Sequence, residues 1–411
     1  MVEFVTSVYL GLMFISIYMM SFFIILTVKN RKRLFSYPKP NLGYNISVIV
    51  PAFNEEESIE ETIRNVMACD YPMNNFQVIV VNDGSTDKTK EIVGRLLKKY
   101  SNLELLNKKN SGKADSLNQA IKIANGDLIA VTDADSFPSK ESLKKLTGYF
   151  DDKKVAAVTS FVSVRNKEGN LYGKVQALEY MIMGWNRKLL DFIDSVYVTN
   201  GPLSLYRKDY VVKVGGFDKD SITEDIDITW NLLSKGYKTG MCLDARVSTV
   251  VPTTFKKWFR QRVRWGIGGI QALKKYKHKF LRRGLFGRFV MPFVFLSIFL
   301  SIGGFAFSSY ILGKAFLTRI LTTGYSIASN ISLFHMQEIN LIPSVMIFYF
   351  IILFFSSLIY YRYVLTKTKF YNRITFGRFL NLIFYMLVFL AFYPIIWYAT
   401  FYRYLKKDFR W

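Results

Sequence analysis

The stretch ISVIV at residues 46–50 is followed at once by the polar turn PAFNEE at residues 51–56. A short apolar run rich in β-branched residues and closed by turn residues predicts a buried strand. Similar runs recur at residues 77–81, 103–106 and 128–132, with helical patterns beginning at residues 57, 87 and 113. The runs are apolar throughout, as in a parallel sheet covered by helices on both faces. The sequence therefore predicts an α/β domain with a mostly parallel sheet.

Four uncharged apolar runs lie outside this domain, at residues 5–28, 289–312, 341–361 and 379–402. Each is long enough to cross a hydrocarbon core, which takes roughly 20 residues. The hydrophobic fraction of 51% and the aromatic fraction of 17% likewise indicate a membrane protein. A cleaved signal peptide would begin with basic residues, whereas here Glu3 precedes the first run and the basic residues follow it.

The chain carries 55 Lys and Arg against 31 Asp and Glu, and the basic residues gather beside the apolar runs, at 29–33 and 274–288. This pattern places residues 29–288 on the cytosolic side of the plasma membrane and favours contact with membrane lipid. Three crossings after the domain put the C-terminus outside, whereas the basic residues among 403–410 favour the inside, so the number of crossings stays open by one. Residues 313–340 form either an outer loop or an interfacial helix.

The expected organisation has four parts. It comprises an N-terminal transmembrane helix at 1–28, a cytosolic domain at 29–254, amphipathic interfacial helices at 255–288 and a C-terminal transmembrane region at 289–411. The two cysteines and two histidines are isolated in the sequence and form no ligand pattern. Any metal ion must therefore be held by carboxylates.

Polar loops close the first two strands, where ligands of such sheets bind. Ala52, Asn54 and Glu55 belong to the first loop, and Asp83 opens the second, NDGSTD at 82–87. A carboxylate there can accept hydrogen bonds from a ribose hydroxyl or a base N–H. The same residues also form ordinary turns and helix caps, so this loop alone supports both interpretations.

Asp133 and Asp135 follow the run at 128–132 and are separated by one residue. Two carboxylates in this arrangement can share Mg²⁺ or Mn²⁺, which keeps open positions for substrate phosphates and neutralises a leaving diphosphate. Further along lie Asn200 and Gly201, and then Glu224 and Asp225 after Thr223. A transferred sugar needs a base for the acceptor hydroxyl, and a carboxylate near the metal is the natural candidate. The same TED triplet also begins a helix.

The segment 255–280 interleaves aromatic and basic residues and contains QRVRW at 261–265. It predicts an amphipathic helix on the membrane surface, in which Arg can bind phosphate and Trp can stack on sugar rings. Taken alone, such a helix is more often a plain membrane anchor.

Together these elements resemble the processive members of glycosyltransferase family 2, which include synthases of cellulose, chitin, hyaluronan and poly-N-acetylglucosamine. That family's pattern of D, DxD, (T/E)ED and Q(Q/R)xRW matches Asp83, 133–135, 223–225 and 261–265. The length and the context SITEDI at 221–226 look closest to bacterial poly-β-1,6-N-acetylglucosamine synthases. The resemblance implies a GT-A-type nucleotide-binding sheet between transmembrane helices. It also implies an inverting enzyme that polymerises a sugar from a UDP-sugar and helps the polysaccharide across the membrane.

The resemblance further implies roles for single residues. Asp225, Glu224 and Asp135 would be catalytic, with Asp225 as the base and Asp135 as the metal ligand. The nucleotide-sugar would bind to residues of the strand-end loops and to a lysine, namely Ala52, Asn54, Glu55, Asp83, Lys113, Asp133 and Asp135. The acceptor and diphosphate would meet Asn200, Gly201, Gln261, Arg262, Arg264 and Trp265.

Several alternatives remain beside this reading. A hyaluronan-type or other β-glycan synthase would carry the same motifs, and a non-processive transferase to a lipid phosphate carrier would share the nucleotide half of the site. A transporter or nucleotide-sensing membrane module would place charges at mid-membrane, and the four apolar runs have none. Nucleic acid is an unfavourable partner for the carboxylate loops. Four helices make a narrow pore, which leaves room for a small membrane partner subunit.

Overall fold

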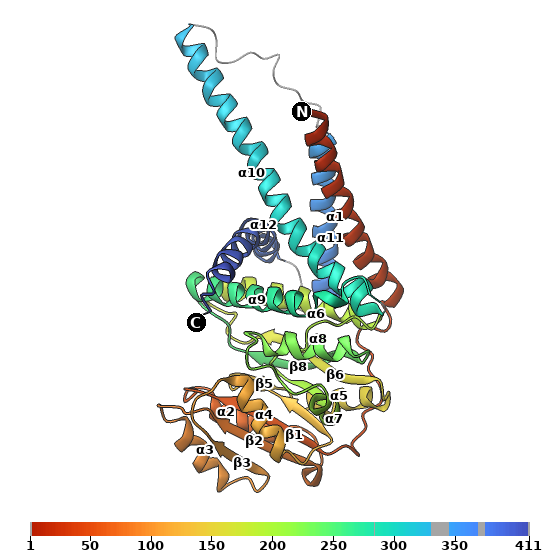
Figure 1. The fold of residues 1–411 in the computed structure, drawn as a ribbon, viewed down its shortest axis with the longest axis vertical. Coiled ribbons are helices and arrows are strands. Elements are labelled where there is room, and N and C mark those ends of the chain that lie inside the picture. The colour runs from red at the N-terminus through yellow and green to blue at the C-terminus, as the bar shows by residue number, and fades with distance from the viewer. Residues whose placement is uncertain (1, 283, 330–344, 369–374, 410–411) are drawn as a thin grey trace.

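An α/β domain occupies the lower half of the molecule, and long helices rise from its upper face (Figure 1). The computed structural model describes residues 2–282, 284–329, 345–368 and 375–409. Within these residues the domain holds one eight-stranded sheet of order β3-β2-β1-β4-β7-β6-β8-β5. Fold class and membrane helices both agree with the sequence-based expectation.

The first half of the sheet is the parallel series expected from the sequence. Its strands are β1 (Ile46–Ala52), β2 (Phe76–Asn82), β3 (Leu103–Asn107) and β4 (Leu128–Val131), and its crossover helices are α2 (Ile59–Met67), α3 (Thr89–Leu97) and α4 (Lys113–Ile123). Strand β1 pairs in parallel with both β2 and β4. The polar loops after β1, β2 and β4 therefore meet at one edge of the sheet.

The second half of the sheet is mixed. Strand β7 (Ser204–Arg207) runs antiparallel to β4 and to β6 (Val155–Val164), while β8 (Lys238–Thr249) pairs in parallel with β6 and antiparallel with the short β5 (Ser136–Pro138). The helices between them are α5 (Ser142–Thr147), α6 (Leu171–Asp191), α7 (Lys208–Lys213) and α8 (Glu224–Ser234). Short helical turns at Met73–Asn75 and Gly148–Asp151 complete the domain.

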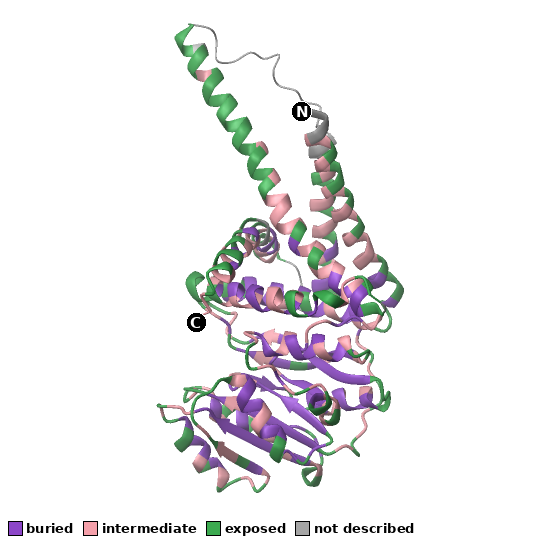
Figure 2. Ribbon diagram, in the orientation of Figure 1, coloured by how far each residue is buried: buried purple, intermediate pink, exposed green. Residues whose placement is uncertain are grey.

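Alternate side chains of the parallel strands pack on opposite faces of the sheet. Val48 and Val50 lie in one buried cluster with residues of α2, α3 and α5, whereas Ile49 and Val131 lie in another with residues of α4, α7 and α8. Burial on both faces explains why the strands are apolar throughout. Figure 2 shows this buried layer running through most of the sheet, except for the edge strand β3.

Helices α6 and α9 (Phe255–Lys275) form the layer between the sheet and the long helices (Figure 1). Trp185 and Leu189 of α6 are buried in a cluster that also holds Leu26 of α1 (Val2–Asn30) and Val364 of α11 (Val345–Lys367). The expected amphipathic segment at 255–288 is thus helical up to Lys275. Short turns at Lys277–Lys279 and Phe286–Val290 follow it.

Among the described residues, four helices are long and apolar enough to cross a membrane, as expected. They belong to α1 (Val2–Asn30), α10 (Met291–Ala328), α11 (Val345–Lys367) and α12 (Phe376–Leu405). Helix α10 continues to Ala328, so the expected outer loop or interfacial helix at 313–340 is, up to that residue, part of one long helix. Residues 330–340 and His335 lie outside the described residues.

Helix α12 is arranged differently from the other three. Helices α1, α10 and α11 rise away from the domain, whereas α12 is seen almost end-on beside α9, and the C-terminus is marked next to the domain (Figure 1). Near its start, Leu382 shares a buried cluster with residues of α6. Near its end, the centre of the Tyr404 ring lies 5.9 Å from the Lys274 ammonium of α9. If α12 lies along α9 without crossing, the basic residues that follow it would be on the same side as the domain.

We expect the C-terminus to be on the same side of the membrane as the domain. Cys69 and Cys242 are buried, so single cysteines introduced at exposed positions can be labelled with an impermeant maleimide. Lys407→Cys should react in the same vesicle orientation as Lys90→Cys of α3. Thr322→Cys, near the far end of α10, should react only in the opposite orientation. Labelling of Lys407→Cys together with Thr322→Cys would show instead that α12 crosses.

Candidate active site

The loops after β1 and β2 are held together by hydrogen bonds. The backbone N–H of Asp83 donates to the carbonyl of Ala52 at 2.9 Å, and that of Thr86 donates to Oδ1 of Asn54 at 2.8 Å. The N–H of Glu55 donates to Oγ1 of Thr89 at 2.8 Å. The structure thus brings together Ala52, Asn54, Glu55 and Asp83, as predicted from their strand-end positions.

Asp83 also organises the loop before α4. Its buried carboxylate accepts hydrogen bonds from the backbone N–H groups of Ser111 at 3.0 Å and Gly112 at 2.9 Å, and it pairs with the Lys108 ammonium. A carboxylate with this many donors is well satisfied despite its burial. Because Gly112 directly precedes α4, these contacts fix the position of Lys113, the first residue of that helix.

Lys113 joins two parts of the site that are far apart in sequence. Its ammonium lies 2.6 Å from Oδ1 of Asp133 after β4 and 2.6 Å from Oε1 of Glu224 at the start of α8. Burial opposes the positive charge, but Asp133 and Glu224 outweigh it and raise the pKa of Lys113. The ammonium therefore stays charged at neutral pH.

Gly201 packs directly on this bridge. A Cβ atom at this position would lie 2.6 Å from Oδ2 of Asp133 and 3.0 Å from Nζ of Lys113. A Cβ atom would displace the Asp133 carboxylate and crowd the Lys113 ammonium, so glycine leaves room for their ion pair. Asn200 and Gly201, which the family resemblance assigned to the acceptor, are thus next to Asp133. Asp133, Asp135, Glu224 and Asp225 are called the carboxylate cluster below.

Asn200 holds a polar atom that has no partner. Its Oδ1 accepts a hydrogen bond from Nη1 of Arg187 on α6, while its buried Nδ2 has no hydrogen-bond partner among the described residues. A buried donor without an acceptor is costly, and a ligand oxygen is one way to satisfy it. Sequence reasoning missed Arg187, because a single arginine within the long α6 carries no motif.

Asp135 lies within the electrostatic influence of Asp133 and Glu55 and forms no ion pair among the described residues. Burial, followed by the charges of Asp133 and Glu55, raises the pKa of Asp135 to about 6. Burial also raises the pKa of Glu55, and the negative charge of Asp133 adds to this rise. Carboxylates whose pKa is raised by neighbouring negative charge are stabilised in their ionised form by a bound cation.

These residues fit the divalent cation expected from the sequence. The described residues contain no group of three or more His, Cys, Asp or Glu side chains that could hold a metal ion. Mg²⁺ commonly uses only one or two protein carboxylates and completes its coordination with substrate phosphates and water. Asp135, with Asp133 beside it, provides a set of this kind.

Glu224 and Asp225 differ in environment although they are adjacent in sequence. Burial alone would raise the pKa of Glu224, but the charge and hydrogen bond of Lys113 more than offset it and lower that pKa. Burial and the neighbouring Glu224 raise the pKa of Asp225 to about 6, with Lys113 and Arg264 opposing the rise. Asp225 is therefore the carboxylate of the two that can readily accept a proton near neutral pH.

Two glycines of α9 allow this helix to press against its neighbours. A Cβ atom on Gly268 would lie 1.9 Å from Oγ1 of Thr223, the residue before α8, and one on Gly266 would lie 2.6 Å from Oγ1 of Thr400 on α12. In addition, the backbone N–H of Ile222 donates to Oε1 of Gln271 at 3.1 Å. Helix α9, which carries QRVRW, is thereby docked onto the turn that presents Glu224 and Asp225.

The four predicted residues of α9 fall into two groups. Gln261, Arg264 and Trp265 are partly exposed, and the charge of Arg264 acts on both Glu224 and Asp225. Arg262 is only 2% exposed and is ion-paired with Glu179 of α6. It does not face the carboxylate cluster in the way expected for a residue that contacts the diphosphate.

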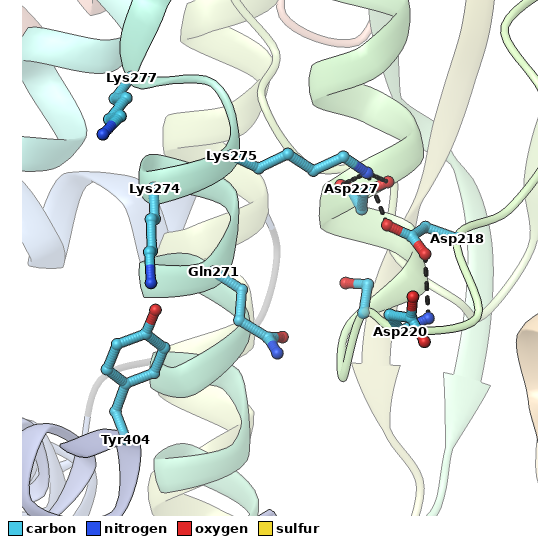
Figure 3. A pocket seen from close by; sticks show the side chains of 9 residues that line it. Asp218, Asp220, Asp227, Gln271, Lys274, Lys275, Lys277 and Tyr404 are labelled. Atoms are coloured by element: carbon cyan, nitrogen blue, oxygen red, sulfur yellow. Dashed lines mark hydrogen bonds and ion pairs between the residues drawn. The ribbon is translucent and has the colours of Figure 1, made fainter. Parts of the chain in front are cut away.

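A separate cavity of about 390 Å³ lies between α9 and the loop before α8. Figure 3 shows Lys275 reaching from α9 to Asp218 and Asp227, with Tyr404 close to Lys274 on the other side. The residues predicted to bind the donor, the acceptor or a metal do not line it. The cavity is therefore distinct from the carboxylate cluster.

Known proteins resemble this chain in sequence and in fold. The chain is 31% identical to the poly-β-1,6-N-acetyl-D-glucosamine synthase of Staphylococcus aureus over 261 residues, which is 62% of this chain and 63% of that protein. Its identity to the Staphylococcus epidermidis synthase is 32% over 234 residues, or 56% of this chain and 55% of that protein. The match thus spans less than two thirds of these relatives.

A solved structure shares the fold over most of the chain. It is the mannosyltransferase PcManGT from Pyrobaculum calidifontis in complex with GDP-Man and Mn²⁺, with a TM-score of 0.57 and 20% identity, covering 94% of this chain and 99% of that one. The sequence model described as "Glycosyltransferase like family 2" matches residues 43–268, which contain the sheet, the carboxylate cluster and most of α9. This protein therefore belongs to glycosyltransferase-like family 2.

Proposed function

We propose that the protein polymerises a sugar from a UDP-sugar, most consistently N-acetylglucosamine in β linkage, and helps move the product across the membrane. The observation that carries the proposal is the cluster around Lys113, which links the donor residue Asp133 to Glu224, next to Asp225. The relatives named as poly-β-1,6-N-acetyl-D-glucosamine synthases support this choice of sugar.

On the donor side, Ala52, Asn54, Glu55 and Asp83 form a continuous edge that suits a nucleoside. Lys113 and Asp133 lie next to it, where the diphosphate of a UDP-sugar would be bound. Asp135, with Asp133, would hold Mg²⁺ or Mn²⁺. The cation supplies positive charge to the diphosphate, which must leave with the electron pair of the sugar–oxygen bond.

On the acceptor side, Asp225 takes the proton from the acceptor hydroxyl while that oxygen bonds to the anomeric carbon of the donor sugar. The bond to the diphosphate breaks in the same step, so the anomeric configuration inverts and UDP leaves. Glu224 is neutralised by Lys113 and is therefore the weaker base of the two. Asn200, Gly201, Gln261, Arg264 and Trp265 would contact the acceptor or the leaving diphosphate.

The layout of the chain suits a cytosolic domain, because UDP-sugars are made in the cytosol and the basic residues flank the domain side of the apolar helices. We infer that the product leaves along α1, α10 and α11, which rise from the domain next to α6 and α9 (Figure 1). Membrane lipid and the growing polysaccharide are then the partners of these helices.

The proposed reaction can be tested with the purified protein in detergent or liposomes. UDP-N-acetylglucosamine, UDP-glucose and UDP-glucuronate are offered singly and paired, with Mg²⁺ or Mn²⁺, and UDP release and product size are recorded. We expect a polymer of high molecular weight from UDP-N-acetylglucosamine alone. A requirement for UDP-glucuronate would indicate a hyaluronan-type synthase, and single-sugar lipid products would refute processivity.

Asp225 and Asp135 should fail in different ways when they are replaced. Asp225→Asn should retain binding of UDP and metal while turnover falls on the order of 10²- to 10⁴-fold, the usual contribution of a general base. Asp135→Ala should also weaken metal-dependent UDP binding, measured by calorimetry. Asp220→Asn, an exposed carboxylate in the loop before α8, is the matched control. Equal losses of UDP binding in the first two variants would contradict these roles.

The pH dependence of transfer should report the ionisation of Asp225. A base must be deprotonated, so kcat/KM should fall as the pH drops below the pKa of about 6 and level off above it. Saturating Mn²⁺ keeps Asp135 ionised and isolates the Asp225 limb. Lys113→Met removes a cation that lowers this pKa, so the limb of the residual activity should move to higher pH. Lys109→Met, at an exposed position, is the control and should leave the pH profile unchanged. If the acidic limb of the profile does not move in Lys113→Met, Asp225 is not the group that causes this limb.

A further inference from the structure

Three helices that are distant in sequence meet at one buried polar cluster. Nε of Arg262 on α9 donates to Oε1 of Glu179 on α6 at 3.1 Å, and Nη2 donates to Oε2 of the same carboxylate. The hydroxyl of Tyr393 on α12 donates to Oε1 of Glu179. Arg262 and Glu179 are each only 2% exposed. The pair uses the planar fork of arginine, and it is closed to solvent.

The same guanidinium also holds two of its neighbours on α9. Nη1 of Arg262 donates to Oε1 of Gln261 at 2.5 Å, and the guanidinium carbon lies 4.2 Å from the centre of the Trp265 ring. Gln261 and Trp265 are the partly exposed residues assigned above to the acceptor. The orientation of both side chains thus depends on a cation fixed from the opposite side by Glu179.

We propose that Arg262 is a positioning residue, held by Glu179 and Tyr393, that sets Gln261 and Trp265 for the acceptor and makes the acceptor subsite depend on α12. This inference rests on the proposed transfer reaction. It revises the sequence-based role of Arg262, because a guanidinium closed off by a carboxylate and aromatic rings has no free edge for a diphosphate. Arg264, whose charge acts on Asp225, keeps the predicted contact with the diphosphate.

The contacts between α12 and α9 come from the second half of α12. Phe392 packs against Phe255 with ring centres 5.2 Å apart, Thr400 meets Gly266, and Tyr404 lies by Lys274, so the second half of α12 runs alongside α9. Tyr393 is the residue in this series that donates to Glu179. Loss of its hydroxyl removes the hydrogen bond to Glu179 and leaves the ion pair and the helix packing in place.

The first test compares two tyrosines whose hydroxyl groups donate hydrogen bonds to different residues of α6. Tyr393→Phe removes the donor to Glu179, whereas the control, Tyr360→Phe, removes the hydrogen bond from α11 to Asn186 of α6 at 3.2 Å. We expect Tyr393→Phe to raise the KM for a short N-acetylglucosamine oligosaccharide about tenfold or more, as misplaced binding groups do. UDP binding by Tyr393→Phe should stay close to that of the wild type. The KM of Tyr360→Phe for the oligosaccharide should also stay close to the wild-type value. Equal effects of the two variants would overturn the proposal.

The second test separates positioning from stability. Glu179→Gln leaves the Arg262 charge buried without a partner and should lower the melting temperature. The double variant Glu179→Gln, Arg262→Met removes that charge and should recover the melting temperature, but not the acceptor KM. Recovery of both would show that Arg262 is only structural. A loss of UDP binding in Arg262→Lys, with none in Tyr393→Phe, would show that Arg262 contacts the diphosphate directly.

A third measurement does not require any activity. A Cβ atom on Gly269 of α9 meets nothing within 4 Å, so Gly269→Cys can carry a spin label, and the native cysteines are buried. The label should become more mobile with Tyr393→Phe and stay unchanged with Tyr360→Phe. Unchanged mobility in both would refute the link between α12 and α9. Because this result is independent of the donor, it remains decisive even if the proposed reaction is wrong.

Discussion

The ammonium of Lys113 is the contact on which the rest of the site depends. It bridges Asp133 and Glu224, which belong to different halves of the mixed sheet and its helices. Without this charge, the end of β4 and the start of α8 would present neighbouring carboxylates that repel one another. Asp83 fixes the loop in front of Lys113, and Gly201 leaves room for the bridge. The backbone of three loops is thus arranged around one cation.

The second constraint is the close docking of α9. Gly268 meets Thr223 and Gly266 meets Thr400, so α9 is held between the start of α8 and the C-terminal helix. An amphipathic helix that only anchored the domain would not need close contacts with the turn before α8. The sequence alone left the plain anchor open, and these glycine contacts argue that α9 belongs to the site as well as to the membrane surface.

The sequence predicted the parallel half of the fold well, because runs such as residues 46–50 and 77–81 are buried on both faces and end in turn residues. It did not predict β6, β7 and β8, whose pairing joins residues far apart in the chain. Asn200 and Gly201 were found through their resemblance to a motif, whereas Arg187 and Glu179 were missed. Both lie singly in α6, and only tertiary packing brings them to Asn200 and Arg262.

The hydrogen bond between Tyr393 and Glu179 joins residues that are 214 positions apart. During synthesis, the domain with its sheet and carboxylate cluster leaves the ribosome well before α12 does, and domains generally fold as they emerge. A nascent chain can therefore bind its nucleotide before its last helix exists, while the partner of Glu179 is still missing. Under the function proposed above, the order of synthesis would give a natural delay, because sugar transfer would await the last helix of the chain.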